Sequence, residues 1–204
     1  MAELTVTTFL SVDGVMQAPG APQEDTSGGF RHGGWVFPHA DAEMGAIVVD
    51  NFSKVEAFLL GRGTYDIFAA HWPRITDPND PIAARLNALP KHVASRSRES
   101  FEWQNSSRVR DVAGEVASLK KRYRGELQVH GSPGLLQTLI QLDLVDEYRL
   151  LTFPVILGSG KRLFGSASLS GALTLKESRT STTGVVYSVY RRSGPVKTGS
   201  FALE

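Results

Sequence analysis

Residues 126–162 constrain the fold of this chain more than any other stretch. Glu126–His130 reads as a strand, Gly131-Ser132-Pro133-Gly134 follows as a turn, and the apolar run after it is spaced as a helix. A second strand then leads to a glycine-rich turn that ends at Gly160. A glycine turn at the start of a helix presents free backbone N–H groups to an anion. The stretch therefore predicts a strand–turn–helix–strand unit with a candidate phosphate site at its first turn.

The same alternation of strands and helices runs from the N-terminus to residue 153. Hydrophobic patterns predict strands at Leu4–Leu10, Ala57–Leu60, Lys91–Ala94, Leu127–His130 and Glu147–Phe153. Helices are predicted for Asp41–Phe52, Thr64–Phe68 and Ile82–Leu89, with Thr64 as the N-cap of the second. Two further helices are predicted after Asp111 and after Ser132, which serve as their N-caps, and Pro133 takes the first position of the last helix. Leu173–Arg179 and Val185–Arg191 pattern as a hairpin. This order predicts a single-domain α/β fold whose sheet is mostly parallel, with a C-terminal antiparallel hairpin.

Composition restricts the classes of function. The chain has 204 residues, 41% of them hydrophobic, and a formal net charge of +1, which gives no electrostatic case for nucleic acid or an anionic membrane. The absence of cysteine excludes disulfides and thiolate metal sites. No signal-like or membrane-spanning segment is evident. We expect a cytoplasmic protein with one domain over residues 1–193 and a tail over 194–204, where Leu203-Glu204 could be vector-derived.

Three strand ends carry residues suited to a ligand with phosphates. Gly61-Arg62-Gly63-Thr64 follows one strand, Ser95-Arg96 follows another, and Gly131–Gly134 follows a third. Because parallel strands end at one edge of a sheet, these turns are expected to meet there. Taken separately, the first could be a tight turn with a solvated arginine and the second an ordinary polar loop. Gly158-Ser-Gly-Lys161 lacks the spacing of a P-loop and is better read as a turn after an edge strand.

Other motifs leave open alternatives. Asp13, at the end of the first strand, could orient a substrate or relay a proton, or could simply be a turn aspartate. Residues 17–39 form a long glycine- and proline-rich loop that is a plausible lid. His130 on a buried strand is more typical of a satisfied core histidine than of a catalyst. The five histidines show no metal-ligand spacing, so no metal site is expected.

In their order along the chain, these motifs resemble the dihydrofolate reductase-like superfamily. The likeness is to the branch with the reductase domain of bacterial riboflavin biosynthesis, the RibD C-terminal domain, and its stand-alone relatives. It is carried by Ser11-Val-Asp-Gly14, Leu60-Gly-Arg-Gly-Thr-Tyr65, Ala94-Ser-Arg96, Val129-His-Gly-Ser-Pro-Gly134 and the segment from Leu144 through Gly158 to Phe164. The resemblance implies a three-layer fold with helices on both faces of the sheet.

The resemblance also implies NADPH as cofactor and a small heterocyclic substrate of pyrimidine or pterin type, such as 5-amino-6-(5-phosphoribosylamino)uracil. For the 2′-phosphate side of the cofactor it suggests Arg62, Thr64, Ser95 and Arg96. For the pyrophosphate turn it suggests Gly131, Ser132, Gly134 and Leu135, with Gly61 beside them. Phe9 would lie near the nicotinamide, and Asp13 is the catalytic candidate. Folate reductases carry a carboxylate early in their first helix, and none of Asp41, Glu43 and Asp50 can be matched to it. A non-catalytic nucleotide- or ligand-binding protein on the same fold therefore stays open, and a homodimer is expected from the riboflavin-type relatives.

Overall fold

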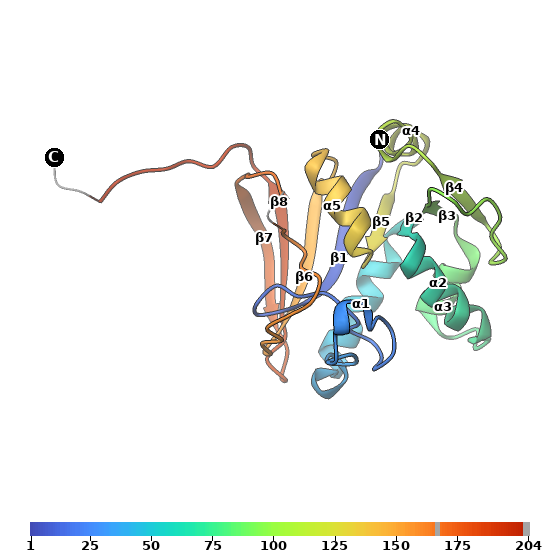
Figure 1. Ribbon diagram of the computed structural model, residues 1–204, viewed down its shortest axis with the longest axis horizontal. Helices are drawn as coiled ribbons and strands as arrows, with labels where there is room; N and C mark the ends of the chain where they lie inside the picture. Colours follow the sequence, from blue (N-terminus) through green and yellow to red (C-terminus); the bar gives the residue numbers. More distant parts are fainter. Residues whose placement is uncertain (166–167, 202–204) are drawn as a thin grey trace.

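The computed structural model describes residues 1–165 and 168–201, and in these ranges the chain forms an eight-stranded sheet between two layers of helices (Figure 1). The strands are β1 Glu3–Ser11, β2 Val55–Gly61, β3 Lys91–Ala94, β4 Ser106–Val109, β5 Glu126–His130, β6 Glu147–Phe153, β7 Leu173–Thr180 and β8 Val186–Arg192. The helices are α1 Ala42–Ser53, α2 Arg62–His71, α3 Pro81–Ala88, α4 Val112–Arg122 and α5 Pro133–Gln141, with 3₁₀ turns at Ser27–Gly29, Phe37–His39 and Trp72–Arg74.

The sheet has the strand order β4-β3-β2-β5-β1-β6-β8-β7. Pairing is parallel from β4 through β6, and β8 and β7 add an antiparallel hairpin at one edge. This topology confirms the predicted single-domain α/β fold with its mostly parallel sheet. It also brings the carboxyl ends of β3, β2, β5 and β1 together along one edge, which is where ligands bind to open α/β sheets.

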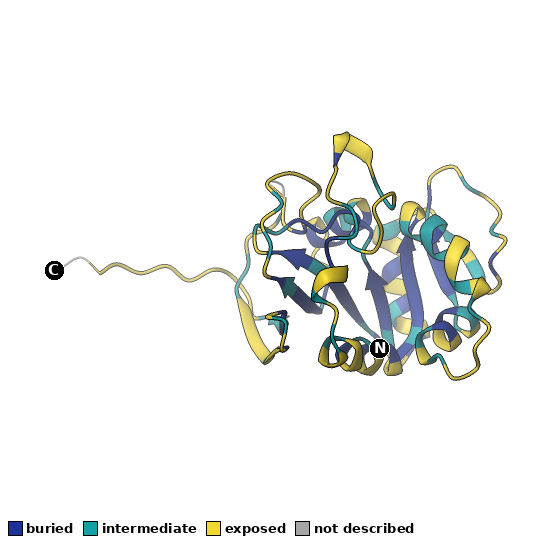
Figure 2. Cartoon of the chain, turned by 90° about the horizontal axis from the view of Figure 1, so that it is seen from below, coloured by how far each residue is buried: buried dark blue, intermediate teal, exposed yellow. Residues whose placement is uncertain are grey.

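Alternation along the strands builds a core on each face of the sheet. In β2, Ala57 and Leu59 pack in a cluster with residues of α4 and α5, whereas Phe58 and Leu60 pack with residues of α1, α2 and α3. A third cluster joins α1 to β6, β8 and the loop that contains Trp35. Figure 2 shows the buried strands between the two helical layers. Burial on both faces explains why the central strands read as continuous apolar runs.

Helix starts follow the expected cap chemistry only in part. The Asp111 side chain accepts a hydrogen bond from the Ala113 N–H and caps α4, as predicted. The prediction that Thr64 caps α2 is wrong: the helix begins at Arg62, and Gly61 occupies the N-cap position without a side-chain bond. Ser132 does stand at the N-cap of α5, but its hydroxyl makes no capping bond because it is used elsewhere, as described below.

The chain after β8 runs away from the sheet as an extended segment (Figure 1). The predicted domain end at 193 stays a prediction, and the proposed vector residues 203–204 lie outside the described residues. Among the helices that the structure describes, none is both long and apolar enough to cross a membrane.

A buried histidine makes stability depend on pH. His92 lies in β3, where its Nδ1 contacts the Ser107 hydroxyl at 2.8 Å and its Nε2 contacts the Tyr123 hydroxyl at 2.8 Å. Burial, helped by the charge of Arg122, lowers the pKa of His92 from 6.5 to about 4. Below pH 6.5 the unfolded chain binds a proton that the folded chain excludes. We therefore expect the free energy of unfolding to fall between pH 6.5 and 4, by about 3 kcal/mol at most from this residue.

The variant His92→Asn isolates this contribution in urea unfolding curves measured from pH 7.5 to 4. Wild type should be more stable at pH 7.5, and the difference from the variant should shrink as the pH falls. His32→Asn, at an exposed position, is the matched control and should follow wild type throughout. A difference between wild type and His92→Asn that stays constant with pH would contradict the assignment.

Candidate active-site cleft

An open cleft of about 1980 Å³ runs along the carboxyl ends of the parallel strands. Its walls come from these strand ends, from α1, α2 and α5, and from the loop over residues 16–27. Each residue predicted to bind a cofactor lines it: Phe9, Gly61, Arg62, Thr64, Ser95, Arg96, Gly131, Ser132, Gly134 and Leu135. The three turns predicted at the strand ends therefore share one surface.

Ser132 ties two of the strand ends together. Its Oγ accepts a hydrogen bond from the Gly61 N–H at 2.7 Å and donates to the Thr64 hydroxyl at 2.8 Å. A Cβ at Gly61 would lie 2.9 Å from the Ser132 Cβ, so only glycine allows the β2 and β5 turns to approach this closely. The backbone of Ser132 is left-handed, with φ of 64°, and follows Gly131 with φ of 55°. The turn thus keeps its shape through side-chain bonds within the site.

Two helices begin at the cleft with unsatisfied backbone donors. The N–H groups of Gly63 and Thr64 lie in the first turn of α2, where the helix itself provides no acceptor for them. In α5 the first backbone bond runs from the Leu136 N–H to the Ser132 carbonyl, and the N–H groups of Gly134 and Leu135 have no acceptor in the same ranges. Such helix ends favour phosphate groups through both their free N–H donors and the helix dipole.

Arginines surround the outer end of the cleft near β2, β3 and β4. Arg62 lies 3.5 Å from Asp66, which also pairs with Arg98 at 2.5 Å. The side chain of Arg96 has no hydrogen-bond or ion-pair partner in the described parts of the chain. Arg110, which follows β4, also lines the cleft, and it pairs with the exposed Glu99 at 3.2 Å. The excess of cations makes this end suitable for an anionic group.

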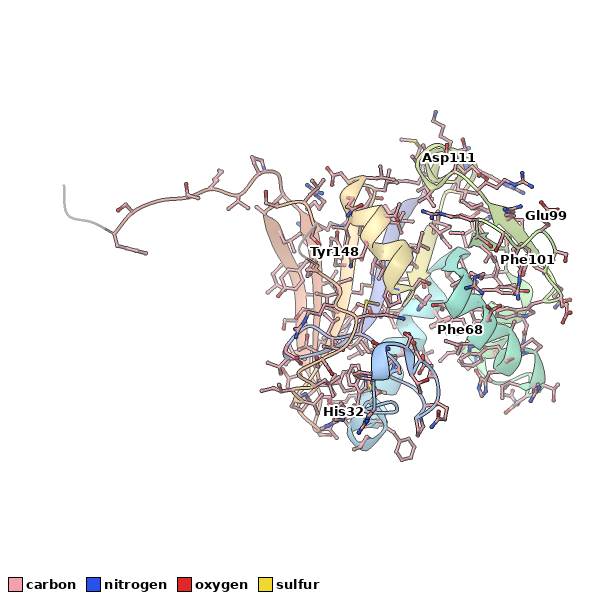
Figure 3. The ribbon with its side chains drawn as sticks, viewed as in Figure 1. His32, Phe68, Glu99, Phe101, Asp111 and Tyr148 are labelled. Atoms are coloured by element: carbon pink, nitrogen blue, oxygen red, sulfur yellow. The ribbon has the colours of Figure 1, made fainter. Side chains whose placement is uncertain are left out.

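Arg108 of β4 holds the loop that carries Ser95 and Arg96. Its side chain is 13% exposed, and its Nε donates to the Ser95 carbonyl at 2.9 Å. It also donates to the Arg96 carbonyl and forms an ion pair with Glu99. Figure 3 shows Glu99 and Phe101 on this loop, on the same side of the molecule as Phe68 of α2. Arg108 therefore shapes the cleft without lining it.

Asp13 lies outside the cleft lining. Its carboxylate accepts hydrogen bonds from the Ser11 hydroxyl at 2.6 Å and from the N–H groups of Leu157 and Gly158 at 3.0 and 2.9 Å. These bonds, with that from Ser11 the strongest, lower the pKa of Asp13 to about 2. An ionised carboxylate with these partners anchors two turns. The catalytic role predicted from the sequence stays a prediction, and the geometry favours the turn aspartate.

The first part of the predicted lid does border the cleft. Residues 17–21, 23–25 and 27 line it, together with Gly160, Lys161 and Arg162 from the turn after β6. Lys161 pairs with Asp25 at 2.6 Å, and the Lys161 N–H donates to the Gln17 side chain at 3.0 Å. The sequence interpretation gave this second glycine turn no role in the site, whereas the fold places it on the rim.

Sequence reasoning missed other lining residues. Arg110 was missed because β4, with the sequence Ser-Ser-Arg-Val, is a short edge strand with no apolar run to reveal it. Asn51 and Phe52 of α1 were predicted to be helical, but their position in the cleft depends on how α1 packs on the sheet. Across the described ranges, no group of three or more histidine, aspartate or glutamate residues could hold a metal ion.

The family model for the RibD C-terminal domain matches residues 2–187. The uncharacterized protein YyaP of Bacillus subtilis (strain 168) is 31% identical over 156 residues, which is 76% of this chain and 82% of YyaP.

Two solved structures share the fold at low sequence identity. One is a protein from Shewanella sp. PV-4 that is named provisionally for riboflavin biosynthesis, with a TM-score of 0.70, 22% identity, and coverage of 95% of this chain and 99% of that one. The other is dihydrofolate reductase from Enterococcus faecalis complexed with NADP(H), with a TM-score of 0.56, 13% identity, and coverage of 93% and 96%.

Proposed function

Because this chain belongs to the RibD C-terminal domain family, we propose that it is an NADPH-dependent reductase of a small heterocyclic substrate of pyrimidine or pterin type. The observation that carries the proposal is the cleft, where two helix N-termini and Arg62 and Arg96 face one open space. The Enterococcus reductase with a similar fold binds NADP(H), which supports the choice of cofactor.

The donor set fits the cofactor proposed. The pyrophosphate would be held by the backbone N–H groups of Gly131, Ser132, Gly134 and Leu135. The Ser132 hydroxyl is not available for it, because it is bonded to Gly61 and Thr64. Arg62 and Arg96 would hold the 2′-phosphate, and Ser95 is buried beside Arg96. When bound, NADPH supplies a hydride. The residues of this chain bind it, orient it and exclude water from the inner cleft.

One observation favours the non-catalytic alternative. Four carboxylates line the cleft, and each already has partners: Glu24 accepts two backbone N–H groups, Asp25 pairs with Lys161, Asp66 pairs with arginines, and Asp111 caps α4. No carboxylate among the described lining residues is left unpaired as an evident proton donor. A protein that binds NADPH or a related ligand without reducing a substrate would have this arrangement.

Cofactor titration separates the two functions. Trp72 lines the cleft, so NADPH binding should quench tryptophan fluorescence, and NADPH should bind more tightly than NADH. NADPH oxidation is then followed with a panel of pyrimidines, pterins and quinones. Turnover supports the reductase, and binding without turnover supports the alternative. Failure of both cofactors to bind at millimolar concentration would reject the proposal.

The predicted homodimer and the predicted cytoplasmic location belong to the same proposal. Light scattering checks the first, and a mass of one chain would reject it. Neither changes the chemistry assigned to the cleft.

A further inference from the structure

His130, the last residue of β5, lies in the inner wall of the cleft next to Gly131. Its ring stacks on Phe52 of α1 with centroids 4.5 Å apart. Thr7 is its register partner on β1, and the residue is 7% exposed. The proposed function gives this side chain no role, and the sequence suggested only a satisfied core histidine.

The hydrogen bonds of Gln128 determine which ring nitrogen of His130 carries the proton. The Gln128 Nε2 donates to the Asn51 carbonyl at 2.7 Å and to the Glu126 carboxylate at 2.7 Å. Because both partners are acceptors, the amide nitrogen must lie on this side and Oε1 on the other. Oε1 lies 2.9 Å from the His130 Nε2 and can only accept. Nε2 is therefore protonated.

The second ring nitrogen is then a free acceptor. Burial, with the positive charge of Arg149 as a further cause, lowers the pKa of His130 to about 3, so the ring is neutral near pH 7. A neutral ring with a proton on Nε2 has a lone pair on Nδ1. Within residues 1–165 and 168–201, no donor bonds to Nδ1.

The surroundings of His130 limit what could donate to it. The neighbours of the His130 ring are uncharged: Thr7 is its register partner on β1, and the rings of Phe52 and Phe58 lie 4.5 and 5.7 Å from it. The charged groups behind it, Glu126 and Arg149, neutralise each other through a two-bond contact at 2.7 and 2.8 Å. An uncharged wall with aromatic faces favours a flat, neutral molecule over an ion.

We propose that the Nδ1 atom of His130 is a specificity-determining acceptor that selects a neutral, planar substrate by an N–H or O–H group on its ring. This inference rests on the proposed function, because it takes the inner cleft to hold the substrate beside NADPH. His130 binds and orients the substrate in this role. It does not supply the proton.

Two variants of His130 separate the ligand bond from the internal one. In His130→Gln the side-chain NH₂ can reach Gln128 as Nε2 does, but the acceptor at the Nδ1 position is lost. In His130→Asn the shorter amide reaches the Nδ1 position and can offer its oxygen there, but the bond to Gln128 is lost. Thermal melts confirm that each variant is folded.

The probes are lumazine and 1,3-dimethyllumazine, which differ in their ring N–H groups, titrated in the presence of saturating NADPH. Wild type should prefer lumazine about tenfold, the effect of one hydrogen bond. His130→Gln should lose this preference, and His130→Asn should keep most of it. A preference that survives in His130→Gln would reflect steric exclusion of the methyl groups and would overturn the proposal, as would failure of lumazine to bind wild type with NADPH in place.

The ligand-free protein offers a second readout. Nitrogen-15 NMR of the histidine rings should show His130 neutral at pH 7, with a proton on Nε2 and none on Nδ1. A proton on Nδ1 would overturn the proposal whether or not either variant folds. NADPH binding is also measured for each protein used in the lumazine titrations. If wild type does not bind NADPH, the proposed function is rejected. If it binds NADPH but shows no His130-dependent preference for lumazine, only this inference is rejected.

Discussion

Replacing Arg149 with leucine is expected to lower the free energy of unfolding by about 3–5 kcal/mol. The Arg149 side chain is 6% exposed, and it bridges Glu126 through two hydrogen bonds and Glu147 through its Nε at 2.8 Å. Burial alone would lower the pKa of Arg149, but the bonds and charges of the two carboxylates outweigh it and raise the pKa above its usual value. Removing the guanidinium leaves Glu126 without its main partner and Glu147 with only Arg191.

Urea unfolding at pH 7.5 measures the loss. Lys54→Met removes an exposed ion pair with Asp50 and is the control, with an expected change within about 0.5 kcal/mol. Adding Glu126→Gln and Glu147→Gln to Arg149→Leu should recover part of the loss, because the unpaired charges are then removed as well. A loss below about 1 kcal/mol in the single variant would show that water or other groups compensate the carboxylates.

The Arg149 cluster also connects to the cleft. Glu126 accepts bonds from both Arg149 and Gln128, and Gln128 in turn accepts the bond from His130. A chain of polar contacts therefore runs across the α1 face of the sheet from β6 to the inner wall. Fixed polar networks of this kind orient side chains as well as stabilise them. We infer that the cluster keeps His130 in a single tautomer.

The fold and the position of the cleft could be predicted because they depend on local patterns. Apolar runs separated by glycine turns identify buried parallel strands, and parallel strands must end at one edge. That geometry placed Gly61, Ser95 and Gly131 together without any knowledge of their contacts. The edge strand β4 was not predicted, because a polar strand with only one neighbouring strand has no apolar run.

The contacts inside the site could not be predicted because they join residues far apart in sequence. A serine before a proline is typical of an N-cap, yet the Ser132 hydroxyl bonds to Gly61 and Thr64, about seventy positions away. The acceptor role of His130 likewise depends on the direction of the Gln128 amide, which α1 determines through the Asn51 carbonyl. Local propensity contains no information on either contact.

The proposed preference for NADPH over NADH gives the largest expected effect on binding. Arg96→Ala and Arg62→Ala are each expected to weaken NADPH binding about 10- to 100-fold and to leave NADH binding nearly unchanged, because a hydrogen bond to a charged group contributes about 1.5–3 kcal/mol. Arg96 should have the larger effect. Its side chain has no partner among the described residues, whereas Arg62 already lies near Asp66. Fluorescence titration with both cofactors measures the ratio of their dissociation constants.

Three further variants test whether the effect is local to the arginines. Lys121→Ala removes an exposed cation on α4 outside the cleft and should leave the NADPH to NADH ratio unchanged. Asp66→Asn removes the carboxylate that competes for Arg62, so it should strengthen NADPH binding and partly offset Arg96→Ala. Arg108→Met should weaken NADPH binding through the Ser95 and Arg96 carbonyls that it holds. If Arg96→Ala weakened both cofactors equally, the arginine would shape the loop and would not contact the 2′-phosphate, and the NADPH preference would have to come from Arg62 or Arg110.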